Sequence, residues 1–333
     1  MKHNVLITGG LGFIGSHIVI KLLQNDYNVF IIDNLENSNF EQITKLKQII
    51  NKKIQWFQGD LRNIQFLDNF FKKYKIDIVV HCAGLKSVEE SEKKPLKYYD
   101  FNVCSTINLL STMDKYNVRK LIFSSSACVY GVPNHTPIDE QHPTNPNNIY
   151  GKTKLINENI LKNLCEKNKD WSVVCLRYFN PIGSHQSGLI GDNPLTNITN
   201  IMPVLNKVLN DKLKIFNIYG NTYKTKDGTA VRDYIHIDDL AKGHKLSVDY
   251  CLHNKGFETF NLGTGVGYSV LEILNTFQKY TNKKINYNFT KKRQGDVEIS
   301  YTNTKKAKEK LKFTAKKNLN QMCKDSIRFY DGL

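Results

Sequence analysis

The sequence predicts an α/β protein built on a doubly wound parallel sheet, followed by a smaller C-terminal α/β domain. Two observations lead to this prediction. Short β-branched apolar runs alternate with segments of helical periodicity through the first half of the chain, which is typical of parallel strands joined by crossover helices. The chain has 333 residues, and at roughly 150 residues per domain this length corresponds to about two domains.

The order of the predicted elements divides the chain near residue 180. Strands are predicted at 4–8, 28–33, 54–58, 77–81, 120–125 and 172–177, and helices at about 15–25, 39–51, 63–74, 96–116 and 150–168. After Asn180 the alternation stops, and loops rich in Gly, Asn and Pro lead to a helix near 201–211. We therefore expect a sheet domain over 1–180 and a smaller domain over 181–333, with part of 234–265 returning to the sheet edge at "TFNLGTG".

Composition is that of an ordinary globular protein, with 40% apolar and 23% charged residues. The chain contains no apolar run of about 18 residues or more, and it enters its first strand without a charged-then-apolar leader. We therefore expect no membrane span, no signal peptide and a cytoplasmic location. Seven scattered cysteines without a Cys-x-x-Cys pair favour reduced thiols over disulfides or a zinc site.

A formal net charge of +16 would suit nucleic acid or another acidic partner. The lysines are spread along the whole chain among many Asn and Ile residues, however, which favours a compositional bias. We therefore predict no nucleic-acid partner. The positive field is expected to help gather a phosphate-bearing small molecule.

A glycine-rich turn follows the first predicted strand. "LITGGLGFIGSH" places Gly9, Gly12 and Gly15 where a tight turn, a close approach to a pyrophosphate and helix–strand packing each require glycine. The helix that follows offers free N–H groups and the positive end of its dipole. Asp33 ends the second strand, where a carboxylate accepts hydrogen bonds from the adenosine ribose and repels a 2′-phosphate, so the sequence favours NAD over NADP.

Two further strand ends extend the same edge of the sheet. Asp60 follows the third strand in "GD", and Lys86 follows the fourth in "CAGLKS". Asp60 is expected to meet the adenine, and Lys86 the ribose or the pyrophosphate. For each, a cap or a solvated loop residue is the alternative.

Tyr150 and Lys154 stand four residues apart in "NNIYGKTK". The same Tyr–Lys spacing recurs at four other tyrosines, which are Tyr116, Tyr280, Tyr287 and Tyr301. Tyr150 differs because it opens a helix after a strand that ends in serines, "FSSSACVYG". A tyrosine that acts as a base near pH 7 needs its reference pKa of about 10 lowered by about 3, worth roughly 4 kcal/mol. Lys154 supplies a cation one helical turn away, and Ser126 can hydrogen-bond a substrate oxygen.

The chain resembles the UDP-glucose 4-epimerase family of the extended short-chain dehydrogenase/reductase (SDR) superfamily, whose sheet domain is a Rossmann fold. Ordered motifs carry the resemblance along nearly the whole chain: "TGGLGFIGSH", "DNLENS", "GDLRN", "HCAGLKSVEES", "SSSACVYG", "YGKTK", "LRYFNPIGSH", "DGTAVRDYIHIDDLA", "NLGTGVGYSVLE" and "KRQGD". The resemblance implies that Tyr150 takes the proton of the sugar 4-hydroxyl, that Lys154 tunes it and holds the nicotinamide ribose, and that Ser126 assists. It also implies oxidation at sugar C4 by tightly bound NAD, rotation of the 4-keto sugar about its bond to the UDP phosphate, and return of the hydride.

The same resemblance assigns binding positions. Cofactor contacts are implied for Gly9, Gly12, Phe13, Ile14, Gly15, Asp33, Asn34, Asn37, Ser38, Asp60, Leu61, Cys82, Ala83, Gly84, Lys86, Ser126, Tyr150, Lys154 and Phe179. Substrate contacts are implied for Lys86, Ser126, Tyr150, Asn180, Asn200, Ile201, Tyr219, Arg232, Arg293, Asp296 and Ser300. Cys82 departs from the family pattern of an aromatic residue, and Phe101 stands where an asparagine often contacts the cofactor.

Within the implied substrate site, Arg232 and Arg293 would grip the diphosphate, because the guanidinium fork matches phosphate oxygens. Tyr219 would meet the uracil edge, and Asp296 the uridine ribose. Ser300 lies four residues after Asp296, at a position that behaves in this family as a gate beside the sugar C2 substituent. A small residue there leaves room for an N-acetyl group, so we predict turnover of UDP-N-acetylglucosamine and UDP-N-acetylgalactosamine as well. The alternative is that Ser300 is only a small strand residue and the gate lies elsewhere.

The segment "YIHIDDLA" brings together His236, Asp238 and Asp239, as a metal site would. We expect instead that the aspartates cap the following helix, and we expect no metal. His17 and His81 are expected to be packed or capping residues.

Other functions of the superfamily require residues that differ from those of an epimerase. Superfamily dehydratases need an acid pair just after the strand-end hydroxyl, where this chain has Ala127 and Cys128. UDP-glucuronate 4-epimerization remains an alternative, as does a non-catalytic relative that binds RNA or protein, although such a relative would have little reason to keep Ser126, Tyr150 and Lys154. The resemblance also implies a homodimer formed through a helix pair, with 96–116 and 150–168 as candidates.

Overall fold

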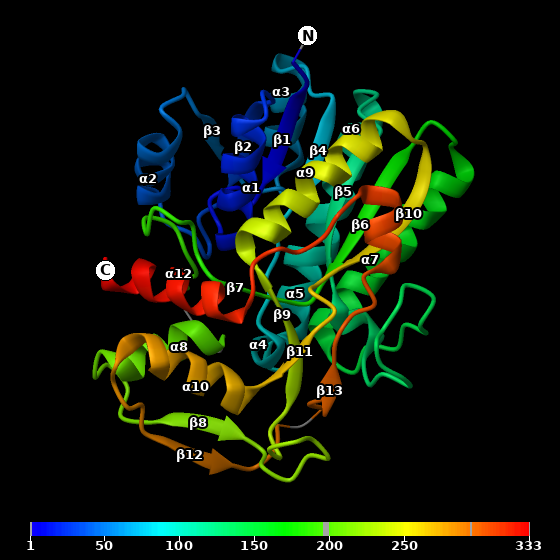
Figure 1. The fold of residues 1–333 in the computed structure, drawn as a ribbon. Coiled ribbons are helices and arrows are strands. Elements are labelled where there is room, and N and C mark those ends of the chain that lie inside the picture. Colours follow the sequence, from blue (N-terminus) through cyan, green and yellow to red (C-terminus); the bar gives the residue numbers. More distant parts are fainter. Residues whose placement is uncertain (1, 196–199, 294, 333) are drawn as a thin grey trace.

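The computed structural model describes residues 2–195, 200–293 and 295–332. Its main sheet has seven strands in the order β10-β6-β5-β4-β1-β2-β3, and each neighbouring pair is parallel (Figure 1). The strands are β1 Asn4–Thr8, β2 Asn28–Asp33, β3 Gln55–Gln58, β4 Ile78–His81, β5 Lys120–Ser126, β6 Ser172–Tyr178 and β10 Gly256–Leu262. The strand order reverses between β1 and β4, so the prediction of a doubly wound parallel sheet is confirmed.

Helices cover both faces of this sheet because its strands are apolar on both sides. Val5 and Ile7 of β1 belong to one buried cluster, with residues of α1, α2 and α9, whereas Leu6 belongs to a second, with residues of α3, α6 and α7. Alternate residues of a strand point to opposite faces, so one strand serves both cores. These helices are α1 Phe13–Gln24, α2 Glu41–Ile50, α3 Ile64–Lys73, α6 Ser105–Lys115, α7 Ile149–Lys167 and α9 Ile237–His253.

The predicted single helix at 96–116 is wrong in detail. The structure has α4 Val88–Lys93, α5 Pro95–Tyr99, a π-helical turn η1 Asp100–Cys104, and then α6. Pro95 opens α5, where its missing N–H costs nothing. The π-turn contains Asn102, whose Oδ1 accepts from Leu85 N at 2.8 Å and whose Nδ2 donates to Thr153 Oγ1 at 3.1 Å. Single π-turns inside α-helices are frequent at functional sites.

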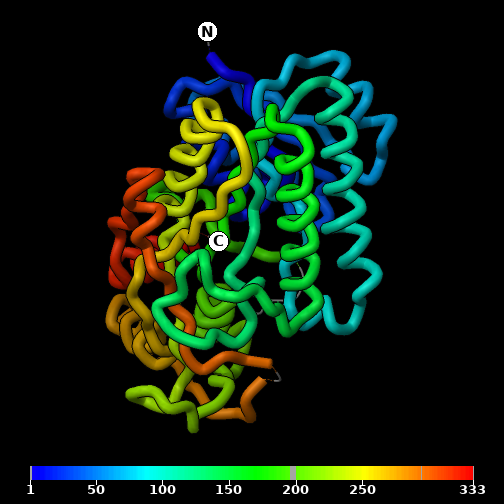
Figure 2. Tube along the Cα trace, turned by 90° about the vertical axis from the view of Figure 1, so that its right-hand side faces the viewer, coloured from blue at the N-terminus to red at the C-terminus, as the bar shows by residue number. Residues whose placement is uncertain are grey.

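A smaller second part lies beyond the carboxyl ends of the main strands. In the side view of Figure 2 its lime and orange segments lie below the main sheet. Its elements are β7 Asn180–Ile182, α8 Ile201–Leu209, β8 Phe216–Tyr219, β9 Val231–His236, β11 Gly267–Ser269, α10 Val270–Thr281, β12 Tyr287–Thr290, β13 Ile299–Ser300 and α12 Leu319–Asp331. Helix α11 Lys305–Leu311 instead packs beside the main sheet, against β10 and α9, and a 3-10 turn, η2 Ala127–Tyr130, follows β5. Residues of α8, α10 and α12 share one apolar core there. Between β9 and β11 the chain returns to the main sheet as β10, which pairs with β6.

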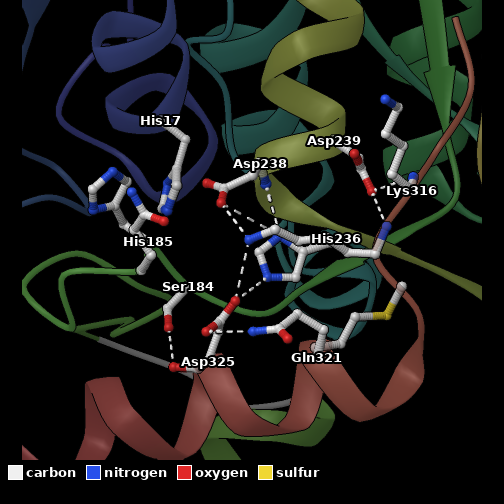
Figure 3. Close-up of polar contacts among 12 residues, drawn as sticks. His17, Ser184, His185, His236, Asp238, Asp239, Lys316, Gln321 and Asp325 are labelled. Carbon is white, nitrogen blue, oxygen red and sulfur yellow. Dashed lines mark hydrogen bonds and ion pairs between the residues drawn. The ribbon is translucent and has the colours of Figure 1, made fainter.

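A buried polar cluster connects the C-terminal helix α12 to the junction between β9 and α9 (Figure 3). His236 Nδ1 accepts from Asp238 N at 3.0 Å and so caps α9, which leaves Nε2 to donate to Asp325 of α12 at 3.1 Å. The expectation that the aspartates cap this helix is therefore wrong, because they lie in its first turn. Asp239 instead accepts from Lys316 N and Lys317 N at 2.9 and 2.8 Å.

None of the helices described in the structure is long and apolar enough to cross a membrane. Within the same residues, no group of three or more His, Cys, Asp or Glu is arranged to hold a metal ion.

Candidate active site

A cleft follows the carboxyl edge of the main sheet. Its walls come from the glycine-rich turn, from the ends of the strands, from the start of α7, and from the loop at 191–195 with Phe329 of α12. The following predicted positions line it: Gly9, Gly12, Phe13, Ile14, Gly15, Asp33, Asn34, Asn37, Ser38, Asp60, Leu61, Cys82, Ala83, Gly84, Lys86, Tyr150 and Lys154. The structure thus brings together residues that lie more than a hundred positions apart in the sequence.

The glycine turn has the shape that a pyrophosphate requires. Gly9 has a φ of +70°, and a Cβ on Gly15 would lie 2.2 Å from Gly9 O, so side chains at either position would disrupt the turn. A Cβ on Gly12 would meet only Gly9 O, at 3.4 Å, so this residue opens toward the cleft. Helix α1, all of which the structure describes, begins without a side-chain cap or an acid in its first turn. Its first N–H groups therefore suit an anion.

Asp33 is held at the end of β2 by the surrounding loops. Its Oδ2 accepts from Leu11 N at 3.0 Å, and its Oδ1 accepts from Leu35 N at 3.0 Å and from Ser38 Oγ at 2.7 Å. These bonds orient an acceptor at the strand end, where a ribose hydroxyl would meet it. The residues present therefore fit NAD.

Asp60 is engaged with a neighbour that sequence reasoning missed. Arg62 Nη2 lies 2.8 Å from Asp60 Oδ2, and the hydrogen bonds from Arg62 hold the pKa of Asp60 well below its usual range. Asn34 Nδ2 also donates to Asp60, at 2.9 Å. Arg62 stacks over Phe101, 3.7 Å from the ring centroid, so Phe101 serves as a platform for the arginine.

Tyr150 is the second residue of α7, and two contacts fix the start of this helix. Asn148 caps it by accepting from Gly151 N at 2.8 Å, while Tyr150 N donates to Ser91 Oγ of α4 at 3.1 Å. Lys154, one turn later, is buried and donates to Ser124 O at 2.8 Å, with its Nζ 5.8 Å from the Tyr150 ring centroid. Ser126 ends β5, and its side chain is hydrogen-bonded to Tyr150.

Burial moves the two pKa values apart. It raises the pKa of Tyr150 well above its usual value, with a hydrogen bond from Ser126 acting in the opposite direction. It lowers the pKa of Lys154 to about 8. In the protein alone, desolvation is the largest influence on the pKa of Tyr150, and the Lys154 ammonium donates to the Ser124 carbonyl. That Lys154 and a bound nicotinamide together lower this pKa stays a prediction.

Asp192 joins the two sides of the cleft and was not predicted. Its Oδ1 lies 3.3 Å from Lys86 Nζ, and its Oδ2 accepts from Asn200 Nδ2 at 2.7 Å. Lys86 belongs to the main-sheet side and Asn200 immediately precedes α8, so one carboxylate holds two predicted binding residues. Only the glycine-bounded "GLIGD" marks this loop in the sequence.

The remaining substrate positions lie in the second part. Arg232 pairs with Asp296, and Arg293 stacks over Tyr219 at 3.8 Å from the ring centroid. Ser300 of β13 lies opposite Arg232 of β9 in the register of the two strands.

Three predicted positions flank these groups. Asn180 begins β7, and Ile201 opens α8. Phe179 lies buried among Val129, Tyr130 and Ile138 rather than along the cleft walls described above.

A seven-stranded parallel sheet with a Tyr–Lys pair and a serine at its carboxyl edge defines an extended SDR enzyme. A family model described as GDP-mannose 4,6 dehydratase matches residues 6–326. The UDP-glucose 4-epimerase of Bacillus subtilis is 45% identical over 98% of this chain and 96% of that protein. A UDP-glucose 4-epimerase structure from Bifidobacterium longum in complex with NAD+ and UDP has a TM-score of 0.96 at 42% identity, covering 99% of this chain and 98% of that chain.

A second structure, from Stenotrophomonas maltophila with bound NAD and formylated UDP-arabinopyranose, has a TM-score of 0.97 at 38% identity, covering 99% and 98% of the two chains. The chain belongs to the UDP-glucose 4-epimerase family.

Proposed function

We propose that this protein interconverts UDP-glucose and UDP-galactose by inverting the configuration at sugar C4, with NAD as a recycled cofactor. The observation that carries the proposal is that Tyr150 and Lys154 line the same cleft as the glycine turn, with Ser126 hydrogen-bonded to Tyr150. NAD would accept a hydride from C4 and later return it, so the net redox change is zero.

The chain's own groups would handle the proton and the substrate. Ser126 would hydrogen-bond the 4-oxygen, and Tyr150 would take its proton and return it. Because burial raises the pKa of Tyr150, this role requires a positive charge in the cleft beyond that of Lys154. The oxidised nicotinamide carries such a charge. Arg232, Arg293 and their partners would hold the UDP end while the sugar presents either face.

The proposed substrate range includes the N-acetylated pair. Ser300 is a small, half-buried residue opposite Arg232, which is consistent with space beside a sugar whose diphosphate binds that arginine. We also propose a cytoplasmic location, in agreement with seven free cysteines. A homodimer through α5, α6 and α7 is proposed because Leu96 is 82% exposed and Ile107 44% exposed on these helices, and light scattering of the purified protein tests it.

A coupled assay with UDP-galactose and UDP-N-acetylgalactosamine, without added metal, tests the function. We expect turnover of both, and we expect Tyr150→Phe to lower kcat by about 1000-fold with NAD still bound, because the variant lacks the general base. Tyr116→Phe is the matched control. Tyr116 has a lysine at the same spacing, but it ends α6 and its hydroxyl donates to Asp68. Wild-type protein that turns over neither substrate would refute the proposal.

A further inference from the structure

We propose that Glu158 is a positioning residue for the catalytic pair, because it fixes the register of α7 on the main sheet through Arg177 and Ser125. The inference rests on the proposed epimerase function and adds to it a residue that touches neither the substrate nor the cofactor.

Glu158 is anchored to two neighbouring strands at once. Arg177 of β6 donates from Nε to Oε1 at 3.0 Å and from Nη2 to Oε2 at 2.6 Å, and Ser125 of β5 donates to Oε1 as well. Ser125 and Arg177 are Cα partners in the β5–β6 ladder, so their side chains stand side by side. Glu158 is only 2% exposed, and its carboxylate is therefore bound to the sheet rather than to water.

The anchor lies on the catalytic face of α7. Glu158 follows Lys154 by four residues and Tyr150 by eight, and residues at this spacing share one side of a helix. Lys154 bonds to Ser124 O, and Glu158 bonds to the next residue of the same strand. A rotation or slide of α7 that broke the Glu158 bonds would therefore carry Tyr150 away from Ser126.

A second layer holds Arg177 in place. Its Nη1 donates to Tyr130 Oη at 3.1 Å, Tyr130 donates to Asn261 Oδ1 of β10 at 2.6 Å, and Asn261 donates to Ile138 O at 3.0 Å. The guanidinium is thus bound on both sides. Because the planar guanidinium of Arg177 has few other orientations that keep all these hydrogen bonds, it holds the carboxylate of Glu158 in one place.

Glu158 also supplies charge to the catalytic lysine. Burial lowers the pKa of Lys154, while Cys82, Glu158 and Cys175 act in the opposite direction. Burial raises the pKa of Cys82 to about 11 and that of Cys175 well above its usual value, whereas Glu158 is ion-paired with Arg177, so Glu158 supplies the negative charge among these three. The groups around the Lys154 ammonium are Ser124 O, the Phe123 and Tyr150 rings, His81, Cys82, Cys175 and Glu158.

The alternative is that the buried ion pair only stabilises the fold. Kinetics with UDP-galactose from about pH 6 to pH 10, together with melting temperatures, separate the two roles. For Glu158→Gln we expect kcat to fall about tenfold with KM changed by less than about twofold, because the bound sugar meets a displaced Tyr150. The basic limb of the kcat profile should move to lower pH by about one unit, because Lys154 loses an anion that favours its charged form.

Three further variants make the test specific. Glu158→Asp keeps the charge, so it should leave the basic limb in place while kcat stays low. Ser125→Ala removes one anchor without stranding a charge, so it should lower kcat even if Glu158→Gln fails to fold. Tyr130→Phe is the matched control, since it weakens the far side of Arg177 and should lower the melting temperature without moving the basic limb.

The outcomes are distinct. Active Glu158→Gln with an unchanged profile and kcat, or Ser125→Ala with unchanged kcat, would overturn the inference while leaving the epimerase function in place. Inactive wild-type protein would overturn both.

Discussion

At Tyr150 and Lys154, burial shifts the pKa values of two neighbouring side chains in opposite directions. It raises the pKa of Tyr150 and lowers that of Lys154 to about 8, because each charged form loses its hydration. Without a ligand, Tyr150 therefore keeps its proton near neutral pH, and Lys154 loses its positive charge at a lower pH than an exposed lysine does.

This arrangement predicts the alkaline side of the pH profile. Lys154 carries its positive charge below its folded pKa, so kcat should fall as the pH rises through about 8. Steady-state kinetics with UDP-galactose measure the limb, and Lys154→Met, which cannot titrate, should remove it together with most of the activity. A wild-type kcat that stays constant up to about pH 10 would contradict this assignment.

Ser300 gives a second prediction at the residue scale. Ser300→Tyr places a ring opposite Arg232 and should lower kcat/KM for UDP-N-acetylgalactosamine by roughly 100-fold, while UDP-galactose loses much less. Ser300→Ala, which keeps the site small, is the control and should turn over both substrates. Equal losses for both sugars in Ser300→Tyr would show that the gate lies elsewhere.

At the scale of elements, the strands were predictable because their apolar runs are short and local. Each of the six strands predicted in the first 180 residues starts and ends within one residue of the observed strand, whereas the returning strand β10 begins three residues before the predicted "TFNLGTG". The helix at 96–116 was not, since the inward reach of Asn102 depends on Leu85 and Thr153, which are distant in the sequence. The prediction of the N-cap of α9 was also wrong, because histidine is not among the residues that usually cap a helix N-terminus, and here His236 does so.

The residues of the site likewise fall into those that the sequence could predict and those that it could not. The glycine turn and the Tyr150–Lys154 pair could be found from spacing and context. Arg62, Asp192 and Glu158 could not, because each gains its role from a partner brought near by folding. The raised pKa of Tyr150 could not be predicted from the sequence, because residue spacing reveals a nearby cation but not how deeply the phenol is buried.

At the scale of the whole molecule, the Asp325 cluster holds the C-terminal helix against the junction (Figure 3). Burial alone would raise the pKa of Asp325, but His236, Gln321 and Lys317 together hold it well below its usual range. Asp325→Asn removes one negative charge from this cluster and leaves its partner Lys317 without that carboxylate, which should cost about 3 kcal/mol of unfolding free energy at pH 7. Urea denaturation measures the loss.

The pH dependence of that loss has a definite sign. Because the folded pKa of Asp325 lies below the unfolded one, its carboxylate stabilises the fold above about pH 4, and this contribution disappears as the pH falls toward the folded pKa. The difference in unfolding free energy between wild type and Asp325→Asn should therefore become smaller as the pH is lowered. Asp170→Asn, which removes an exposed pair with Lys255, is the control and should have no measurable effect. A gap that persists unchanged into acid would mean that the charge is not responsible.

The return of β10 to the main sheet decides how the chain can be divided. A fragment ending at residue 180 would keep six of the strands but leave β6 with one side unpaired, exposing backbone N–H and C=O groups that a second molecule can bind. The Tyr130 hydroxyl would also lose Asn261, its acceptor on β10. Residues 1–180 therefore do not form a complete sheet domain that could be transferred alone. Engineering that exchanges the substrate-binding half must either carry residues 256–262 with the sheet or cap that edge by design.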